Sequence, residues 1–595
     1  MCGITGILTL DGSPAKRETV EKMNGTIAHR GPDGHGFFVD GPVGLGHRRL
    51  SIIDLESGSQ PMRSANGQAT LVFNGEIYNY PTLREDLLKK GYPFQTHSDT
   101  ECILALYQLE GEEGFKKLSG MFAFALWDSR QQRLLLVRDR AGMKPLYFAT
   151  VRGHFVFASE IKAIRAAFPE VEEIDRSAVN YYFSRQYIGG ETTIFQKVKK
   201  VKPGAWLDVR PEGQIRETPY WQLTPGPPSP PEGGRSVSLA EAEKRTDELL
   251  ANAVRSHLIA DVPVGVFLSG GLDSSTVLSY AAEQSERKLQ TFSVGFGENN
   301  ELNETHFAKK LAQRYGTEHH EIHVTEPEVL DCLPHIIRHM DQPLADYAVL
   351  PTYVMSRFAA QHVKVVLSGE GADELFGGYK RYHAYALFDR LPFSGFFKNW
   401  LPGPSVFKPN DRKRLLNPDV FIENPLLPQE QQLLFDKNYF APAGHVNSML
   451  YTDLHNWLVD DLLMKVDKMG MLASLEARIP FLDHTLVEYV ASLDGRLKVS
   501  LKAKKILLRR VATKRLPPEI FNRPKHGFTV PVGDWLRGAL RETFEEVVLN
   551  DPANAAWFDL DFLKKLFAEH LQGKNHRLQL WAVLVFCWWG RNRVS

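Results

Sequence analysis

Hydrophobic and polar positions follow different patterns in the two parts of this chain. In the first part, short apolar runs bounded by turn residues predict strands, and three stretches with helical spacing interrupt them. The predicted strands are 4–10, 44–53, 69–73, 121–128, 133–138, 146–149 and 154–159, and the predicted helices are about 15–28, 81–90 and 99–110. Strands grouped together, with helices segregated from them, predict an α+β layered domain.

In the second part, apolar strands alternate with amphipathic helices. The predicted strands are 262–268, 291–295, 318–324 and 364–367, and the predicted helices are 238–257, 274–284 and 304–315. This alternation predicts a doubly wound parallel sheet, in which ligands bind at the carboxyl ends of the strands. After about residue 375 the pattern is mostly helical, with Pro-rich stretches near 401–430.

A break in composition separates the two parts. Residues 223–234 contain five prolines and three glycines, which neither continue a helix nor pair in the middle of a sheet. We predict an extended linker here. The predicted organisation is a first domain over 1–222, a linker over 223–236 and a second domain over 237–595.

Composition and charge exclude several classes of protein. Among the 595 residues, 71 Lys and Arg balance 71 Asp and Glu, which excludes a broadly basic surface for nucleic acid. The four cysteines have neither the number of a disulfide framework nor the spacing of a zinc site. The start of the chain has no basic signal-peptide region, and the apolar stretch 578–590 is too short to cross a bilayer. We therefore expect a cytoplasmic protein without a membrane partner.

Cys2 is the first candidate for chemistry. If the initiator methionine is removed, Cys2 carries both a thiol and a free α-amino group. The reference pKa of such an amine is about 7.7–8.0, so it can act as the base for its own thiol near neutral pH. Taken alone, a cysteine at position 2 is more simply a small buried residue.

Four further segments follow Cys2 in a fixed order. They are 29–33 (HRGPD), 46–54 (GHRRLSIID), 73–79 (FNGEIYN) and 98–101 (SDTE). This ordered set resembles the glutaminase domain of the class II glutamine amidotransferases, which are N-terminal nucleophile hydrolases. The resemblance covers about residues 2–190 and implies an αββα layered fold.

The resemblance also implies roles for single residues. Cys2 would attack the carboxamide of glutamine, and Asn74 with the backbone N–H of Gly75 would form the oxyanion hole, an arrangement suited to developing negative charge. The glutamine-binding residues would be Asn74 and Gly75 again, with Arg49 on the α-carboxylate and Glu76 and Asp99 on the α-ammonium. The simpler alternative is a hairpin turn at Asn74-Gly75 and a surface charge at Arg49.

A Ser/Gly loop follows the predicted strand that ends near Leu268. In the sequence SGGLDSS (269–275), Gly270 and Gly271 let a pyrophosphate approach the start of a helix, and the serines add hydroxyl donors. The loop lacks the Gly-Lys-Ser/Thr ending of a Walker motif. It resembles the pyrophosphate loop of ATP pyrophosphatases, which activate a carboxylate as an acyl-adenylate.

A second Ser/Gly loop, SGEGADE (368–374), follows strand 364–367. Asp273 of the first loop and Asp373 of the second are hard oxygen ligands of the kind that Mg²⁺ shares with phosphates. We therefore predict that both aspartates bind the metal. The alternative is that these acids cap a helix.

Together, the two loops and further segments at 460–463, 467–468, 475–483 and 504–509 resemble the synthetase domain of glutamine-dependent asparagine synthetases. By this resemblance Glu370 supports formation of β-aspartyl-AMP and Lys505 stabilises the adenylation transition state, although Lys504 next to it leaves the register open. The implied ATP-binding residues are Leu268, Ser269, Gly270, Gly271, Asp273, Ser274, Ser275, Val294, Ser368 and Gly369.

The resemblance implies an enzyme with glutamine, aspartate and ATP as substrates and Mg²⁺ as cofactor. The first domain would release ammonia, and the second would transfer it to β-aspartyl-AMP, giving asparagine, AMP and pyrophosphate. Because ammonia is mostly protonated at neutral pH, a sheltered route between the two sites is expected. The alternative is an amidotransferase that acts on another carboxylate, on a sugar, peptide or natural-product precursor. A cyclising synthetase without glutaminase chemistry is less consistent with Cys2. A homodimer is left open.

Overall fold

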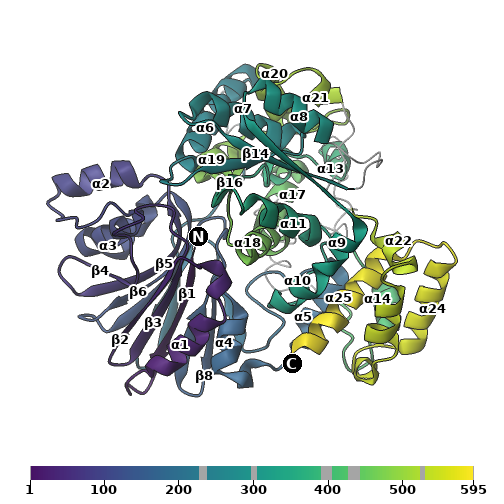
Figure 1. The fold of residues 1–595 in the computed structure, drawn as a ribbon, viewed down its shortest axis with the longest axis horizontal. Coiled ribbons are helices and arrows are strands. Elements are labelled where there is room, and N and C mark those ends of the chain that lie inside the picture. The colour runs from purple at the N-terminus through teal and green to yellow at the C-terminus, as the bar shows by residue number, and fades with distance from the viewer. Residues whose placement is uncertain are drawn as a thin grey trace.

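Two antiparallel sheets lie face to face in the N-terminal part (Figure 1). The computed structural model describes residues 2–226, 237–296, 305–389, 405–425, 443–522 and 530–593. In sheet order, the first sheet contains β10 (Val198–Lys200), β8 (Tyr147–Val151), β9 (His154–Ala158), β1 (Gly3–Thr9), β3 (Val43–Arg49) and β2 (Gly34–Asp40). The second contains β12 (Ile215–Pro219), β11 (Ala205–Val209), β7 (Arg133–Arg138), β6 (Gly120–Asp128), β5 (Ala69–Ile77) and β4 (Met62–Arg63).

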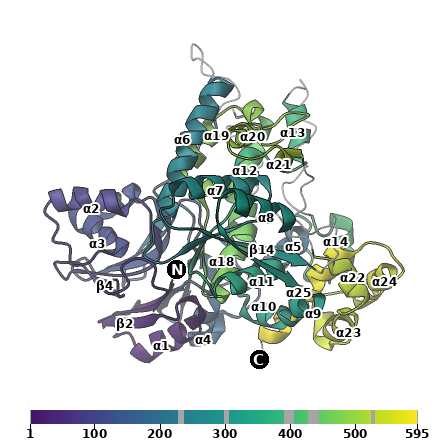
Figure 2. The same ribbon diagram turned by 45° about the horizontal axis from the view of Figure 1, so that its top comes forward.

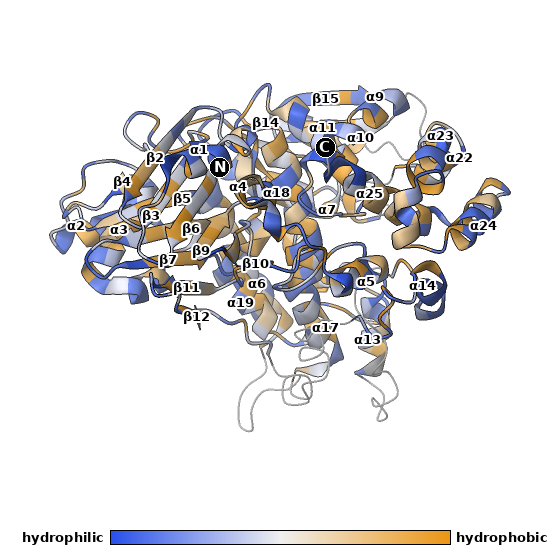
Figure 3. Cartoon of the chain, turned by 90° about the horizontal axis from the view of Figure 1, so that it is seen from below, coloured by the Kyte–Doolittle hydropathy of each residue, from blue (hydrophilic) through white to orange (hydrophobic). Residues whose placement is uncertain are grey.

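Alternating apolar side chains hold these sheets together. Leu45 and Phe157 of the first sheet pack against Val72 and Ala125 of the second in one fully buried cluster. The strands accordingly appear mainly hydrophobic in Figure 3. Helices α1 (Arg17–Gly25) and α4 (Ile161–Ala167) cover the outer face of the first sheet, and α2 (Tyr80–Lys89) and α3 (Asp99–Glu110) cover that of the second. The predicted αββα layering is confirmed.

The second part is built on a five-stranded sheet in which every neighbouring pair is parallel. Its order is β15 (Glu318–Val324), β14 (Gln290–Phe296), β13 (Val264–Phe267), β16 (Val365–Leu367) and β17 (Glu476–Arg478). The chain runs outward from β13 to β15 and then returns to β16 on the other side of β13. The carboxyl ends of β13 and β16 therefore form the switch point where doubly wound sheets bind ligands. The predicted parallel sheet is confirmed.

Helices surround this sheet and extend beyond it (Figure 2). They include α6 (Leu239–His257), α7 (Leu272–Gln284), α8 (Thr305–Arg314), α9 (Glu326–Asp331), α11 (Val349–Ala359), α12 (Ala372–Phe376), α13 (Tyr382–Phe388), α17 (Gly444–His455), α18 (Leu463–Leu472), α19 (His484–Ser492), α20 (Ile506–Thr513) and α21 (Glu519–Asn522). Near the C-terminus, α22 (Val532–Arg537), α23 (Arg541–Phe544), α24 (Leu560–Leu571) and α25 (Arg577–Arg593) share a hydrophobic core with α5 (Arg176–Arg185), α10 (Leu333–His339) and α14 (Pro409–Leu415). No helix in the described ranges is long and apolar enough to span a membrane.

Several elements differ from the sequence-based expectations. The strand expected over 44–53 ends at Arg49, because the chain then leaves the sheet and curls around the Arg49 side chain. The strands β2, β4, β10, β11 and β12 were not predicted. Strand β17 was also missed, since its residues Glu476 and Arg478 have the polarity of a surface segment and are buried as an ion pair. Most of the linker lies outside the described residues.

Candidate active sites

Cys2 lies at the start of β1, buried between the two sheets of the N-terminal part. Its backbone nitrogen is 3.0 Å from Asn74 Oδ1 on β5, and its thiol is 3.9 Å from the carbonyl oxygen of Leu50. Burial raises the pKa of the thiol. A thiol in these surroundings needs an adjacent base to become a nucleophile, and the α-amino group of the same residue is the base that the sequence predicts.

Asn74 and Gly75 lie side by side on β5. Asn74 Nδ2 is buried and has no hydrogen-bond partner in the described part of the chain, which is costly unless a ligand completes it. At Gly75, φ is +156°, and an added Cβ would be 2.1 Å from the carbonyl oxygen of Met121. Position 75 therefore accepts only glycine, and the simple hairpin turn is wrong because both residues lie inside a nine-residue strand.

Arg49 ends β3 and points into the loop that follows it. Its guanidinium donates hydrogen bonds to the carbonyl oxygens of Leu55, at 3.2 Å, and Asp54. A Cβ at Gly58 would be 2.8 Å from the carbonyl oxygen of Asp54, so a glycine is needed where the loop closes over the arginine. The loop therefore holds Arg49 in place near the predicted glutamine site. The alternative, a surface charge, would instead leave the guanidinium freely solvated.

Asp99 and Glu76 are buried on adjacent elements. Asp99 Oδ2 accepts a hydrogen bond of 2.9 Å from the backbone of Ile77, and burial raises the pKa of this carboxyl to about 6. Glu76 Oε2 is 3.5 Å from Arg478 Nη2 of the second part, and burial raises the pKa of Glu76 too. Glu76 therefore lies where the predicted glutamine site meets β17.

The two Ser/Gly loops meet at the switch point of the parallel sheet. A Cβ on Gly369 would lie 2.7 Å from the backbone nitrogen of Ser274, so the loops are in direct contact. In the first loop, Ser269 Oγ lies 3.0 Å from Ser274 Oγ and accepts a hydrogen bond from the Gly271 backbone. Gly270 has a φ of +69°, which favours glycine in this turn. The loops thus line one cradle at the N-terminus of α7.

The remaining predicted ATP residues lie around this cradle at different depths. Leu268 precedes the first loop, and its carbonyl oxygen accepts a hydrogen bond of 2.5 Å from Ser293 Oγ on β14, next to the half-buried Val294. Ser368 is bound to β17 through a hydrogen bond from its backbone nitrogen to the carbonyl oxygen of Arg478. Ser275 is fully buried behind the loop surface, so it is the member of the set least accessible to a ligand.

Lys505 connects the two predicted metal ligands. Its Nζ is 2.6 Å from Asp273 Oδ1 and 2.7 Å from Asp373 Oδ1. Its backbone adopts the left-handed conformation, with a φ of +51°, at the start of α20, a strained geometry that is frequent at functional sites. The two carboxylates therefore converge on one cation. Within the described residues no cluster of three or more metal-ligating side chains occurs, so a metal here would share its coordination with other oxygens.

Glu370 has a buried cationic neighbour that the sequence did not indicate. Lys465 Nζ of α18 lies 3.9 Å from Glu370 Oε1 and 3.1 Å from Asp346 Oδ2. Asp346 and Lys465 are separated by 119 residues, and neither lies in a segment with a recognisable local pattern. Lys465 lies within the stretch between the matched segments 460–463 and 467–468, which is the one signal that could have drawn attention to it.

Comparisons with known proteins fit this geometry. A model of the glutamine amidotransferase domain matches residues 1–221, and a model of asparagine synthase matches residues 245–591. The chain belongs to the asparagine synthase family. It is similar to asparagine synthetase [glutamine-hydrolyzing] 1 of Bacillus subtilis, with 38% identity covering 99% of this chain and 96% of that protein.

Other members of the asparagine synthase family are also similar over most of their length. A putative asparagine synthetase [glutamine-hydrolyzing] of Mycobacterium bovis is 34% identical, covering 99% of this chain and 97% of that protein. A protein of Gibberella zeae named amidase chry2 is 30% identical, covering 92% of both chains. The family therefore contains members that are named for different activities.

Proposed function

We propose that this member of the family is a glutamine-hydrolysing asparagine synthetase. The observation that carries the proposal is that one chain brings together the residues predicted for each of the two sites. In the first, Cys2 lies beside Asn74, whose Nδ2 has no hydrogen-bond partner in the described residues, and in the second, Lys505 lies between Asp273 and Asp373. The match to asparagine synthetases over almost the full chain supports the same reading.

In the glutaminase, the Cys2 thiol attacks the carboxamide carbon of glutamine, and its proton passes to the Cys2 α-amino group. This requires removal of Met1. Asn74 Nδ2 and the Gly75 N–H stabilise the oxyanion, and ammonia leaves with the transferred proton. Water then hydrolyses the thioester and releases glutamate. Arg49 pairs with the α-carboxylate of glutamine, and Asp99 and Glu76 pair with its α-ammonium.

In the synthetase, a carboxylate oxygen of aspartate attacks the α-phosphorus of ATP, and pyrophosphate leaves. Ammonia then attacks the acyl-adenylate, and AMP leaves with the formation of the amide. The Ser/Gly loops cradle the phosphates, Lys505 balances their charge, and Glu370 lies where the acceptor must approach. The convergence of Asp273 and Asp373 on one cation fits Mg²⁺, whose remaining ligands would be phosphate oxygens and water. When bound, Mg²⁺ would neutralise phosphate charge.

We propose that ammonia passes between the two sites along an apolar path. One continuous hydrophobic cluster joins Leu50, Tyr78 and Met121 of the first part to Val266 and Leu268 of the second. Leu50 contributes the carbonyl oxygen near the Cys2 thiol, and Leu268 directly precedes the first Ser/Gly loop. Charge is costly in such surroundings, so the path favours uncharged ammonia over ammonium.

ATP–pyrophosphate exchange over a panel of carboxylates, with and without glutamine, tests the proposal. We expect exchange with L-aspartate and formation of asparagine when glutamine or ammonia is added. Exchange with another carboxylate but not with aspartate would instead favour the alternative acceptor. Other carboxylates are included because one relative is named an amidase. The domain boundaries at 222 and 236 and a cytoplasmic location stay predictions.

A further inference from the structure

The glutaminase site is held from outside its own domain, by helix α18. Arg30, at the end of a short 3-10 helix (Ala28–Arg30), donates a hydrogen bond of 3.1 Å from Nε to the carbonyl oxygen of Cys2. The two Nη atoms of the same guanidinium bind Asp467 of α18, at 2.9 Å and 3.3 Å. One planar side chain therefore connects the predicted nucleophile to a residue 437 positions away.

The contact is buried, so its geometry is tightly constrained. The side chain of Arg30 is 0% exposed and that of Asp467 is 2% exposed. Burial alone would raise the pKa of Asp467, but Arg30 and Lys144 hold that pKa below its usual value, so Asp467 is a carboxylate. A bidentate arginine–carboxylate pair fixes both the position and the plane of the guanidinium. The remaining Nε–H can then point only at the Cys2 carbonyl.

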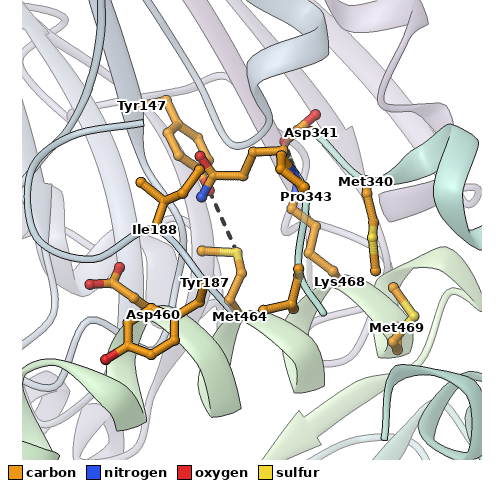
Figure 4. Close-up of a pocket in the computed structure, with 12 residues that line it drawn as sticks. Tyr147, Tyr187, Ile188, Met340, Asp341, Pro343, Asp460, Met464, Lys468 and Met469 are labelled. Atoms are coloured by element: carbon orange, nitrogen blue, oxygen red, sulfur yellow. Dashed lines mark hydrogen bonds and ion pairs between the residues drawn. The ribbon is translucent and has the colours of Figure 1, made fainter. Parts of the chain in front are cut away.

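Further contacts fix α18 against the same segment. Ser474, just after the helix, donates a hydrogen bond of 2.7 Å to the carbonyl oxygen of His29. Lys468 binds Asp341, which also accepts hydrogen bonds from the backbone of Ile161 at the start of α4. Figure 4 shows Met464 and Lys468 of α18 near Tyr147 of the N-terminal part, across a small cavity.

The position of α18 is set at the same time by the synthetase site. Lys465, two residues before Asp467, lies 3.1 Å from Asp346 and 3.9 Å from Glu370. Because residues two apart in a helix point in different directions, α18 can contact both sites at once. Glu370 and Asp346 thus hold one side of this helical turn through Lys465. The other side of the turn carries the Asp467 carboxylate that orients Arg30.

We infer that Asp467 is a positioning residue of the glutaminase, which acts through Arg30 to hold Cys2 in its attacking geometry. The inference rests on the proposed glutaminase function, but not on the identity of the acceptor. Arg30 also contacts Glu160 of its own part, at 2.9 Å, so loss of Asp467 leaves Arg30 with a counter-charge but without its bidentate partner. The expected defect is therefore in geometry rather than in buried charge alone.

The test is glutamine hydrolysis, measured with glutamine alone on the full chain. We expect Asp467→Asn to lower kcat by about tenfold or more with little change in KM, because a fully buried Arg30 orients Cys2 and not the substrate. Lys364→Met is the control, since it breaks another ion pair between the two parts, Lys364 with Asp33 at 2.6 Å, which includes neither Arg30 nor Asp467. This control should keep the wild-type kcat.

A double-mutant cycle separates positioning from a general structural role. Arg30→Lys keeps the charge but cannot bind Asp467 in two places, so adding Asp467→Asn to it should lower kcat no further. Thermal unfolding shows whether each variant is folded, with melting temperatures expected within about 3 °C of wild type. If Asp467→Asn does not fold, the cycle is repeated with Asp467→Glu, which keeps the charge and shifts the oxygens.

Two outcomes would overturn the inference. One is a wild-type kcat in a folded Asp467 variant, and the other is a loss of kcat that multiplies with that of Arg30→Lys. A wild-type chain that fails to hydrolyse glutamine would contradict the proposed function itself, and is recognised before any variant is compared.

Discussion

Lys505 Nζ lies 2.7 Å from Asp373 Oδ1, and so joins two loops that end different strands of the parallel sheet. Its second contact, with Asp273, completes a partly buried bridge between α7, α12 and α20. A lysine so placed holds the two carboxylates together when no phosphate is present. If Asp273 and Asp373 are the metal ligands proposed above, they would hold the ion while the same ammonium pairs with the phosphates, so the bridge and the proposed reaction would use the same three side chains.

Asp273→Asn and Asp373→Asn should each lower pyrophosphate release by at least about tenfold, because each removes one anionic oxygen donor from the metal and one partner from Lys505. Glutamine hydrolysis should survive at least in part, since Cys2 lies in the other domain. Pyrophosphate release in the presence of ATP, Mg²⁺ and aspartate measures the effect. The exposed Asp331 on α9 gives the control, Asp331→Asn, which should behave as wild type.

Near-normal pyrophosphate release in either loop variant would mean that these aspartates do not bind the metal. A Mg²⁺ titration adds a sharper reading. If the carboxylates are ligands, the half-saturating Mg²⁺ concentration should rise in both variants and stay unchanged in Asp331→Asn.

Gly369→Ala should impair adenylation while leaving glutamine hydrolysis intact. An added Cβ would lie 2.7 Å from the backbone nitrogen of Ser274, closer than such contacts allow, so the two Ser/Gly loops must separate. Gly590→Ala is the control, because an added Cβ there meets nothing within 4 Å. The KM for ATP and the rate of pyrophosphate release are measured for both. Unchanged ATP kinetics in Gly369→Ala would show that the loops need not touch to bind the nucleotide.

The sequence predicted the parts of the sites that are local. Cys2, Asn74-Gly75 and the Ser/Gly loops each lie in a short segment in which residue type and spacing carry the signal. The choice between Lys504 and Lys505 could not be made this way, because it depends on a left-handed residue that aims one side chain at two distant aspartates. Here the structure favours Lys505.

Contacts between the two parts were beyond sequence reasoning for a physical reason. In the sequence, Arg30 is one residue of the segment 29–33 and carries no separate signal. Asp467 lies 437 residues later, on a helix whose pattern does not indicate a contact with Arg30. Arg478 has the polarity of a surface residue, yet it is fully buried, where it pairs with Glu476 and lies 3.5 Å from Glu76 of the first part. Pairing of this kind depends on tertiary geometry and leaves no periodic trace in the chain.

Cys2→Ala should abolish asparagine synthesis from glutamine and keep synthesis from ammonia. The thiol is the proposed nucleophile, whereas the synthetase loops lie on the other part of the chain and need only ammonia. Asparagine formation is measured with each nitrogen donor in turn. Loss of both activities in a folded variant would contradict separable sites. Intact-mass analysis of active wild-type protein should find Cys2 at the N-terminus, and active protein that retains Met1 would contradict the proposed base.

The last prediction concerns the pH dependence of glutamine use. Burial raises the pKa of Asp99 to about 6, so the carboxyl is ionised above about pH 6 and protonated below it. Glu476 adds to this rise and Arg478 opposes it. Only the carboxylate can pair with the α-ammonium of glutamine, so kcat/KM for glutamine should fall as the pH drops through about 6. The ratio kcat/KM is measured because it reports ionisation of the free enzyme.

The Asp99→Asn variant isolates this effect. Its amide oxygen can still accept the hydrogen bond from Ile77, so the local fold is kept, but it has no charge to lose. We expect a lower kcat/KM at pH 8 and no further titration near pH 6. If the variant retains the wild-type titration, another group causes the fall, and Glu76, whose pKa burial also raises, is then the residue to substitute. A wild-type profile that is flat between pH 5 and 8 would contradict the role of Asp99 in binding the ammonium, since neutralising one of the two carboxylates proposed to pair with it must weaken glutamine binding.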